Sequence, residues 1–234
     1  MPSIEPRREL GARLVLLVVA FVAATSSAIA DTETAAVAAA SNSLETFRKL
    51  VLKENAEALG FDDFTKVPTA TLELGTAFGD YFIRLDKLKD YSGGPVEPLL
   101  EPGSRIFFPV LIDGKPKASV TVVKTNGSWK PGMFGSSQLA QVAQITRELL
   151  EKREPSGTEF FFVRIPGLQR VLVGHRRGGK VILTPLAKPT PKKPDATKAD
   201  LSPGYTLAPE VLAEELLKSL APRAKDVLQH PAPG

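Results

Sequence analysis

Basic side chains gather around one tight turn near the C-terminal third of the chain. Four of them flank Gly178-Gly179, a pair typical of a β-hairpin turn: His175, Arg176, Arg177 and Lys180. At such a turn, four side chains that can carry positive charge could bind phosphates or an anionic polysaccharide. The simpler interpretation is a solvated turn whose charges discourage strand-to-strand aggregation. We take the four residues as candidate binding residues.

Aromatic residues form a second candidate site. Three consecutive phenylalanines, 160–162, lie in a predicted strand, and Phe107, Phe108 and Trp129 lie in others. Because side chains alternate across a strand, one face of the run is expected to enter the core. The other face, either Phe161 or its two neighbours, must be covered by a helix or by a partner. We add Phe161 to the candidate binding residues.

The common catalytic signatures are absent. There is no cysteine, which excludes disulfides, thiolate metal sites and cysteine nucleophiles. The two histidines, His175 and His230, support neither a paired-histidine metal site nor a histidine-dependent triad. The chain also lacks H-E-x-x-H, G-x-S-x-G, S-x-x-K, Walker-type and dinucleotide-binding motifs. We therefore expect no catalytic residue, no metal and no cofactor, in a protein that is not an enzyme.

Carboxylates in predicted loops leave one enzymatic alternative open. These are Asp62, Asp63, Asp86 and Asp113. Paired carboxylates can hydrolyse glycosides or bind calcium, although the spacing matches no ion-binding loop. The simpler interpretation is that they are turn and helix-exit residues.

The first 30 residues predict a cleavable signal peptide. A positively charged stretch, 1–13, precedes the apolar run 14–24, which is too short to span a bilayer but has the length of a signal core. Ala28 and Ala30 supply the small side chains that signal peptidase needs. We expect cleavage after Ala30, with a cut after Ala24 as the alternative, and a periplasmic or secreted protein. No later apolar run has membrane length, so we expect no transmembrane segment in the mature chain.

Composition and net charge limit the classes of partner that the protein is expected to bind. Hydrophobic residues make up 43% of the chain and charged residues 24%, as in a globular domain. The formal charge is +4, and the expected signal peptide contributes three arginines and two glutamates to it. This balance is too weak to indicate nucleic acid, whose binding needs a concentrated basic face. The expected partner is an unidentified protein or an anionic polymer of the cell envelope.

A single α+β domain over 42–187 is expected to position these residues. Residues 31–41 have the composition of a flexible spacer. A helix over 42–60 follows, with Asn42 and Glu45 at capping-box spacing and Gly60 at its end.

Strand and turn signals complete the domain. Asp113-Gly114 and Asn126-Gly127 are hairpin signals and predict an antiparallel meander. A second amphipathic helix begins at Ser136 or Ser137, and the order of helix then strands occurs twice, with the two helices covering the sheet. The expected strands are 71–75, 80–85, 105–112, 117–124, 128–133, 159–165, 170–175 and 180–186.

The last segments are a Pro/Lys-rich linker over 188–206 and an amphipathic helix with a tail over 207–234. Pro209 suits a first helical position, and Pro222 is expected to end the helix. The helix can pack back on the domain or dock on another protein. Its acidic face argues against anionic membranes.

The helix over 42–60 followed by the two hairpins resembles exported cystatin-like domains, including PepSY-type modules, in element order. Residues 105–134 also resemble part of an uncharacterised bacterial secreted family. The inhibitory Q-x-V-x-G motif of cystatins is absent, so protease inhibition is not implied. We expect a non-catalytic binding module of the envelope or periplasm. The alternatives are a carboxylate-dependent hydrolase and a structural envelope protein that contacts anionic polymer.

Overall fold

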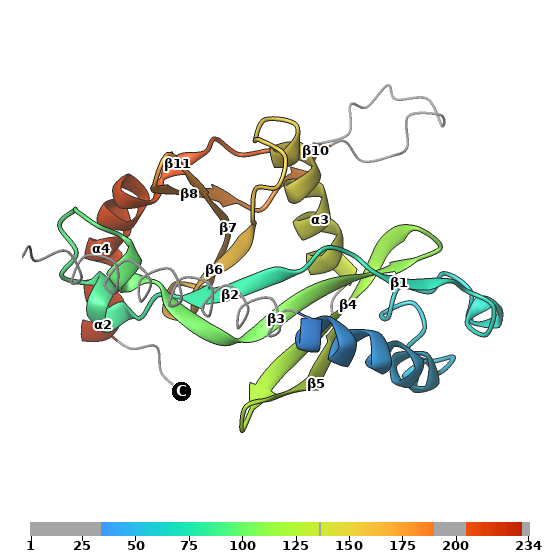
Figure 1. Cartoon of the computed structure of the whole chain (residues 1–234). Coiled ribbons are helices and arrows are strands. Elements are labelled where there is room, and N and C mark those ends of the chain that lie inside the picture. Colours follow the sequence, from blue (N-terminus) through green and yellow to red (C-terminus); the bar gives the residue numbers. More distant parts are fainter. Residues whose placement is uncertain (1–33, 136, 190–204, 231–234) are drawn as a thin grey trace, which may run out of the picture.

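The computed structural model describes residues 34–135, 137–189 and 205–230 (Figure 1). The expected signal peptide lies outside these residues, as do most of the expected linker and the last four residues of the expected tail. Within the described chain the fold is α+β, as predicted, with one large sheet and helices packed against it. None of the described helices is both long and apolar enough to cross a membrane.

The first described helix, residues 34–50, begins earlier than predicted. The described part of the expected spacer, 31–41, is therefore helical, and Asn42 lies inside the helix rather than at its cap. Ala36 and Ala40 are one turn apart and fully buried, so their small side chains let the helix lie close against the sheet. Alanine also has the highest helix propensity, which a search for large apolar residues overlooks.

The same helix also ends earlier than predicted, at Leu50, and turns fill 53–60. Gly60 nevertheless has the left-handed conformation expected of it, with φ of 90°. A Cβ at Gly60 would lie 2.1 Å from the carbonyl oxygen of Lys117. Glycine is therefore required where this turn crosses β4 (Lys115–Thr125).

Two antiparallel meanders make up most of the sheet. The first consists of β3 (Glu101–Ile112), β4 and β5 (Ser128–Gly135), with turns at Asp113-Gly114 and Asn126-Gly127. All four turn residues have φ between 50° and 79°, as two-residue hairpin turns require. The predicted hairpins and meander are confirmed.

The second meander consists of β6 (Phe161–Ile165), β7 (Arg170–Arg177) and β8 (Lys180–Pro185). β2 (Phe78–Phe82) joins the two meanders, because it pairs antiparallel with β3 and parallel with β6. β1 (Leu72–Leu74) pairs with the other end of β3, on the same edge as β2. Among the described strands the order is β11-β8-β7-β6-β2-β3-β4-β5, so the sheet is mostly antiparallel.

Helices cover both faces of this sheet. α3 (Ser137–Glu151) packs on the face that carries Phe160 and Phe162, while α4 (Ala213–Gln229) and the short α2 (Leu85–Leu88) pack on the face that carries Phe161 (Figure 1). The helix over 34–50 packs on the first meander. Each of the three phenylalanines is at most 1% exposed. Of the two expected covers, a helix or a partner, the structure has a helix, because α4 covers the Phe161 face and leaves none of the three rings exposed.

The C-terminal helix packs back onto the domain but has other limits than predicted. Residues 211–212, expected in its first turns, form β11 (Val211–Leu212) and pair with the edge of β8. The helix continues through Pro222 to Gln229 instead of ending at the proline, whose ring lies on the exposed side. Leu217 is fully buried against the sheet.

The two ends of the expected linker pair with each other. β9 (Lys188–Pro189) and β10 (Tyr205–Thr206) form a separate antiparallel pair. The first two and the last two residues of the expected linker, 188–206, thus lie side by side in extended conformation, and the residues between them lie outside the described chain. Three single-turn 3-10 helices complete the described elements: η1 (Phe64–Lys66), η2 (Glu97–Leu99) and η3 (Pro166–Leu168).

Candidate functional site

The β7–β8 hairpin carries four of the five candidate binding residues. Gly178 and Gly179 have φ of 57° and 73° and form its turn, as predicted. The four side chains do not share one basic surface, however. Arg176, Arg177 and Lys180 are exposed, but His175 is fully buried. The expectation that His175 lies at the surface of the hairpin is wrong.

Alternation along β7 explains this difference. His175 lies on the α3 side of the sheet, where its ring is 5.6 Å from that of Phe160. Arg176 lies on the opposite side, with its guanidinium 5.0 Å from the centroid of the Phe161 ring. Phe161 is buried, so it supports Arg176 from inside the protein through a cation–π contact.

Arg177 pairs with two glutamates from distant parts of the chain. Its Nε donates to Glu154 over 3.0 Å and its Nη2 donates to Glu210 over 2.6 Å. Nη2 also donates to the other oxygen of Glu154. Arg153 makes a longer ion pair with Glu210, at 3.7 Å. Two carboxylates thus face two guanidinium groups, and the group is electrically balanced when His175 is neutral.

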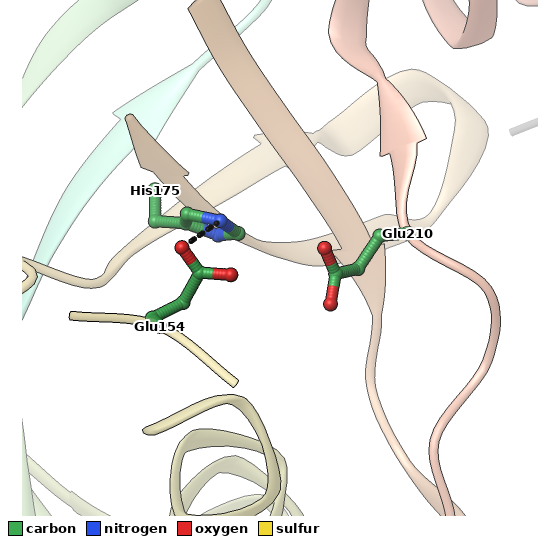
Figure 2. A group of neighbouring side chains, drawn as sticks. All are labelled: Glu154, His175 and Glu210. Carbon is green, nitrogen blue, oxygen red and sulfur yellow. Dashed lines mark ion pairs between the residues drawn. The ribbon is translucent and has the colours of Figure 1, made fainter. Parts of the chain in front are cut away.

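The side chains of Glu154, His175 and Glu210 converge, as Figure 2 shows. Glu154 lies in the turn after α3, His175 in β7, and Glu210 directly before β11. One potential ligand atom of each residue lies within 4.8 Å of the others. The side chains of Glu154 and His175 are 1% and 0% exposed, and that of Glu210 is 16% exposed. We call these three residues the Glu–His–Glu cluster.

The imidazole of His175 has no hydrogen-bond partner among the described residues, on either nitrogen. Burial lowers the pKa of His175, and the charge of Glu154 opposes this only in part, so the ring is neutral at neutral pH. The hydrogen bond from Arg177 lowers the pKa of Glu154, so that carboxyl is ionised. The cluster therefore offers one neutral nitrogen and two carboxylates, a donor set that transition metals accept.

A cavity of about 280 Å³ lies beside the hairpin turn. Gly179 and Lys180 line it together with Glu97, Leu212 and Glu214. The Glu214 carboxylate accepts a hydrogen bond from the Gly94 N–H over 2.9 Å. Because one lysine faces two glutamates in this lining, the cavity has no excess of positive charge for an anionic polymer.

A different polar group lies where β2, β3 and β6 meet. The carboxylate of Asp80 accepts a hydrogen bond from Arg164 Nε over 2.7 Å and lies 3.2 Å from Arg105 Nε. The side chain of Asp80 is 5% exposed, whereas those of Arg164 and Arg105 are 24% and 47% exposed. One buried carboxylate thus holds two guanidinium groups in place, with one net positive charge. We call these residues the Arg–Asp–Arg trio.

Two irregularities in the sheet position the side chains around the trio. Opposite Asp80, β3 places three residues, 103–105, where regular pairing places one. Gly103 permits this close approach, because a Cβ there would lie 2.8 Å from the Asp80 carbonyl oxygen. In β5 the extra residue is Gly132, and the adjacent Met133 is 59% exposed. Bulges of this kind redirect neighbouring side chains.

The Arg–Asp–Arg trio and Met133 line a cavity of about 120 Å³, which we call the cradle. Its other walls are apolar side chains, two hydroxyls and a glycine: Phe107, Leu139, Ser119, Thr121 and Gly135. An apolar lining beside oriented cationic groups suits a ligand that has a small acidic group next to an apolar part.

The four aspartates in loops each have a structural contact with a neighbouring residue of the fold. Asp62 pairs with Lys117, and Asp86 pairs with Arg84 at 2.8 Å. Asp63 accepts a hydrogen bond from the Thr65 N–H, and Asp113 accepts one from the Thr71 N–H. These contacts favour the interpretation that the four are turn and helix-cap residues.

Comparisons with known proteins identify no relative, since no protein-family model, curated protein or solved structure matches the chain.

The sequence analysis missed Glu154, Glu210 and the whole Arg–Asp–Arg trio. Only one signal in the sequence pointed to this region: Gly132 lies inside the expected strand 128–133, and a glycine within a strand often marks a bulge.

Proposed function

We propose that this protein is an exported, non-catalytic binding module of the cell envelope, and that it holds an acidic segment of a partner protein in the cradle. The observation that carries the proposal is the Arg–Asp–Arg trio, in which two arginines share one buried carboxylate at the wall of a largely apolar cavity. The expected signal peptide, which lies outside the described residues, is the basis for the location.

Hydrogen-bonding capacity supports an acidic ligand. Among the described residues, the contacts of Arg105 and Arg164 with Asp80 run through Nε, so the terminal nitrogens of both guanidinium groups remain for a second carboxylate. Arginine binds carboxylates through such pairs of nitrogens. Because Asp80 already orients both side chains, little conformational entropy is lost when a ligand binds.

Size and apolar surface support a protein segment. A cavity of about 120 Å³ holds only one small group, so most of the ligand must lie across the rim. Met133 at this rim is 59% exposed, and methionine adapts its shape to varied apolar partners. An acidic side chain with apolar neighbours in sequence meets both requirements.

Amide NMR titration with poly-glutamate tests this proposal. The protein is taken from the periplasm or the medium, where N-terminal sequencing should begin at Asp31. We expect poly-glutamate to shift the amide signals of Arg105 and Met133, whereas poly-lysine should leave them unchanged. Arg105→Gln and Met133→Glu should each weaken binding roughly tenfold, because the first removes a cation and the second adds a repelling charge.

The matched control is Arg223→Gln, which makes the same change of charge at an exposed site on α4, on the other face of the sheet. It should bind as the wild type does. If poly-glutamate shifts no signal at the cradle, or if Arg223→Gln weakens binding as much as Arg105→Gln, the cradle is not the binding site. Stronger shifts with an anionic polysaccharide would favour the structural envelope protein instead.

A further inference from the structure

The Glu–His–Glu cluster contains a buried polar side chain without a partner. His175 is fully buried and neither ring nitrogen has a hydrogen bond among the described residues. Leaving a buried polar group unsatisfied costs about 1–3 kcal/mol. Nε2 nevertheless faces the Glu154 carboxylate at 3.5 Å, which is too long for a hydrogen bond.

This spacing is the spacing of two ligands on one metal ion. Zinc binds histidine nitrogen and carboxylate oxygen at about 2.0–2.2 Å, so that neighbouring ligands of a tetrahedral ion lie about 3.4 Å apart. The pair formed by His175 and Glu154 already has this separation. Glu210 completes the set, since one potential ligand atom of each residue lies within 4.8 Å of the others.

Arg177 pairs with both carboxylates and lies where it would compete with an ion. Its guanidinium contacts Glu154 and Glu210, but its side chain is 49% exposed and it directly precedes the Gly178-Gly179 turn. The side chain can therefore turn out into solvent without moving the strand. The two carboxylates would then balance the charge of a divalent cation.

We propose that Glu154, His175 and Glu210 bind one divalent transition-metal ion of the zinc class, and that Arg177 takes the place of the ion when it is absent. The nitrogen ligand distinguishes this class from calcium and magnesium, which prefer sites made of oxygen alone. The site lies beside the β7–β8 hairpin, which supplies only His175, and it is separate from the cradle.

Zinc titration of the untagged full chain tests the site, by competition against a chromophoric chelator. We expect one Zn²⁺ per chain. Arg177→Gln should bind Zn²⁺ at least about tenfold more tightly, because a competing cation is removed, whereas Glu154→Gln and Glu210→Gln should each bind it at least about tenfold more weakly. Both Glu→Gln changes keep the side-chain volume, and circular dichroism checks their fold. Co²⁺ in place of zinc should give the intense visible bands of a four-coordinate ion.

The matched control is His230→Gln, because His230 with Asp226 forms the other histidine–carboxylate pair of the described chain, at 3.3 Å on the surface of α4. It should bind zinc as the wild type does. The proposal fails if neither the wild type nor Arg177→Gln binds zinc stoichiometrically. It also fails if the Glu→Gln variants bind unchanged, or if His230→Gln abolishes binding.

Discussion

At the scale of single residues, neighbouring side chains of β7 belong to different surroundings: His175 lies beside Phe160 in the Glu–His–Glu cluster, whereas Arg176 lies over the Phe161 ring on the other face. Applied to β7, alternation shows that His175 and Arg176 must lie on opposite faces, so the basic residues could have been separated from the sequence alone. The partners of His175 could not be found in this way. Glu154 lies in a turn, and Glu210 directly precedes the edge strand β11. Only the folded sheet brings these two residues close to His175.

Gly174 provides a prediction at this scale. It pairs with Phe161 across β6 and β7, and a Cβ there would lie 2.4 Å from the Phe161 ring. Gly174→Ala must displace a buried ring, so we expect the free energy of unfolding to fall by about 1–3 kcal/mol. Urea denaturation, monitored by tryptophan fluorescence, measures this free energy of unfolding.

Gly79→Ala is the control for this change. Gly79 also pairs with Phe161, from the other neighbouring strand, but a Cβ there would meet its nearest atom only at 3.9 Å. Its stability should stay at or above that of the wild type. Equal losses in the two variants would show that the Phe161 ring is not what limits Gly174.

At the scale of elements, the sequence predicted those turns and strands whose conformation depends on residues close together in the chain. Asp113-Gly114 and Asn126-Gly127 determine their own turns through the φ angles that they tolerate, so both hairpins were found. The helix over 34–50 was misplaced because its buried face consists partly of alanines, whose burial depends on the sheet beneath. Pro222 did not end α4, since an exposed proline can be accommodated in a helix that packing holds in place.

Arg147 on α3 anchors the segment between β1 and β2. Its terminal nitrogens donate to the carbonyls of Thr76 and Ala77 over 2.7 and 2.8 Å, and its guanidinium lies 4.1 Å from the centroid of the Phe78 ring. Burial lowers the pKa of Arg147 to about 10, so it remains charged at neutral pH. Arg147→Met leaves two carbonyls unpaired and should lower the free energy of unfolding by about 2–4 kcal/mol.

The control removes only the exposed partner of the same arginine. Glu151 lies 3.6 Å from Arg147 Nε and its side chain is 53% exposed, so Glu151→Gln should change stability by less than about 1 kcal/mol. Guanidinium denaturation of both variants gives the comparison. A loss below 1 kcal/mol for Arg147→Met would mean that the segment is held by other contacts.

At the scale of the whole molecule, the sheet is continuous from β11 to β5 because β2 pairs with a strand of each meander. The sequence predicted the strands of the two meanders but not this parallel junction, since β2 and β6 are far apart in the chain and no local signal joins them. The Arg–Asp–Arg trio lies at that junction, with one residue each from β2, β3 and β6. The cradle thus depends on the contact that sequence reasoning could least predict.

The C-terminal segment belongs to the same core, and cutting the chain before it tests this. We insert a recognition sequence for a specific protease between Asp195 and Ala196 and cleave there. Because β11 pairs with β8 and Leu217 is fully buried, the two fragments should co-elute in gel filtration. With Leu217→Asp they should separate after cleavage, since that change buries an unpaired charge. Leu228→Asp, at a position that is 46% exposed on the same helix, should leave the fragments together. Release of the C-terminal fragment from the otherwise unchanged protein would show that α4 contributes no essential part of the core.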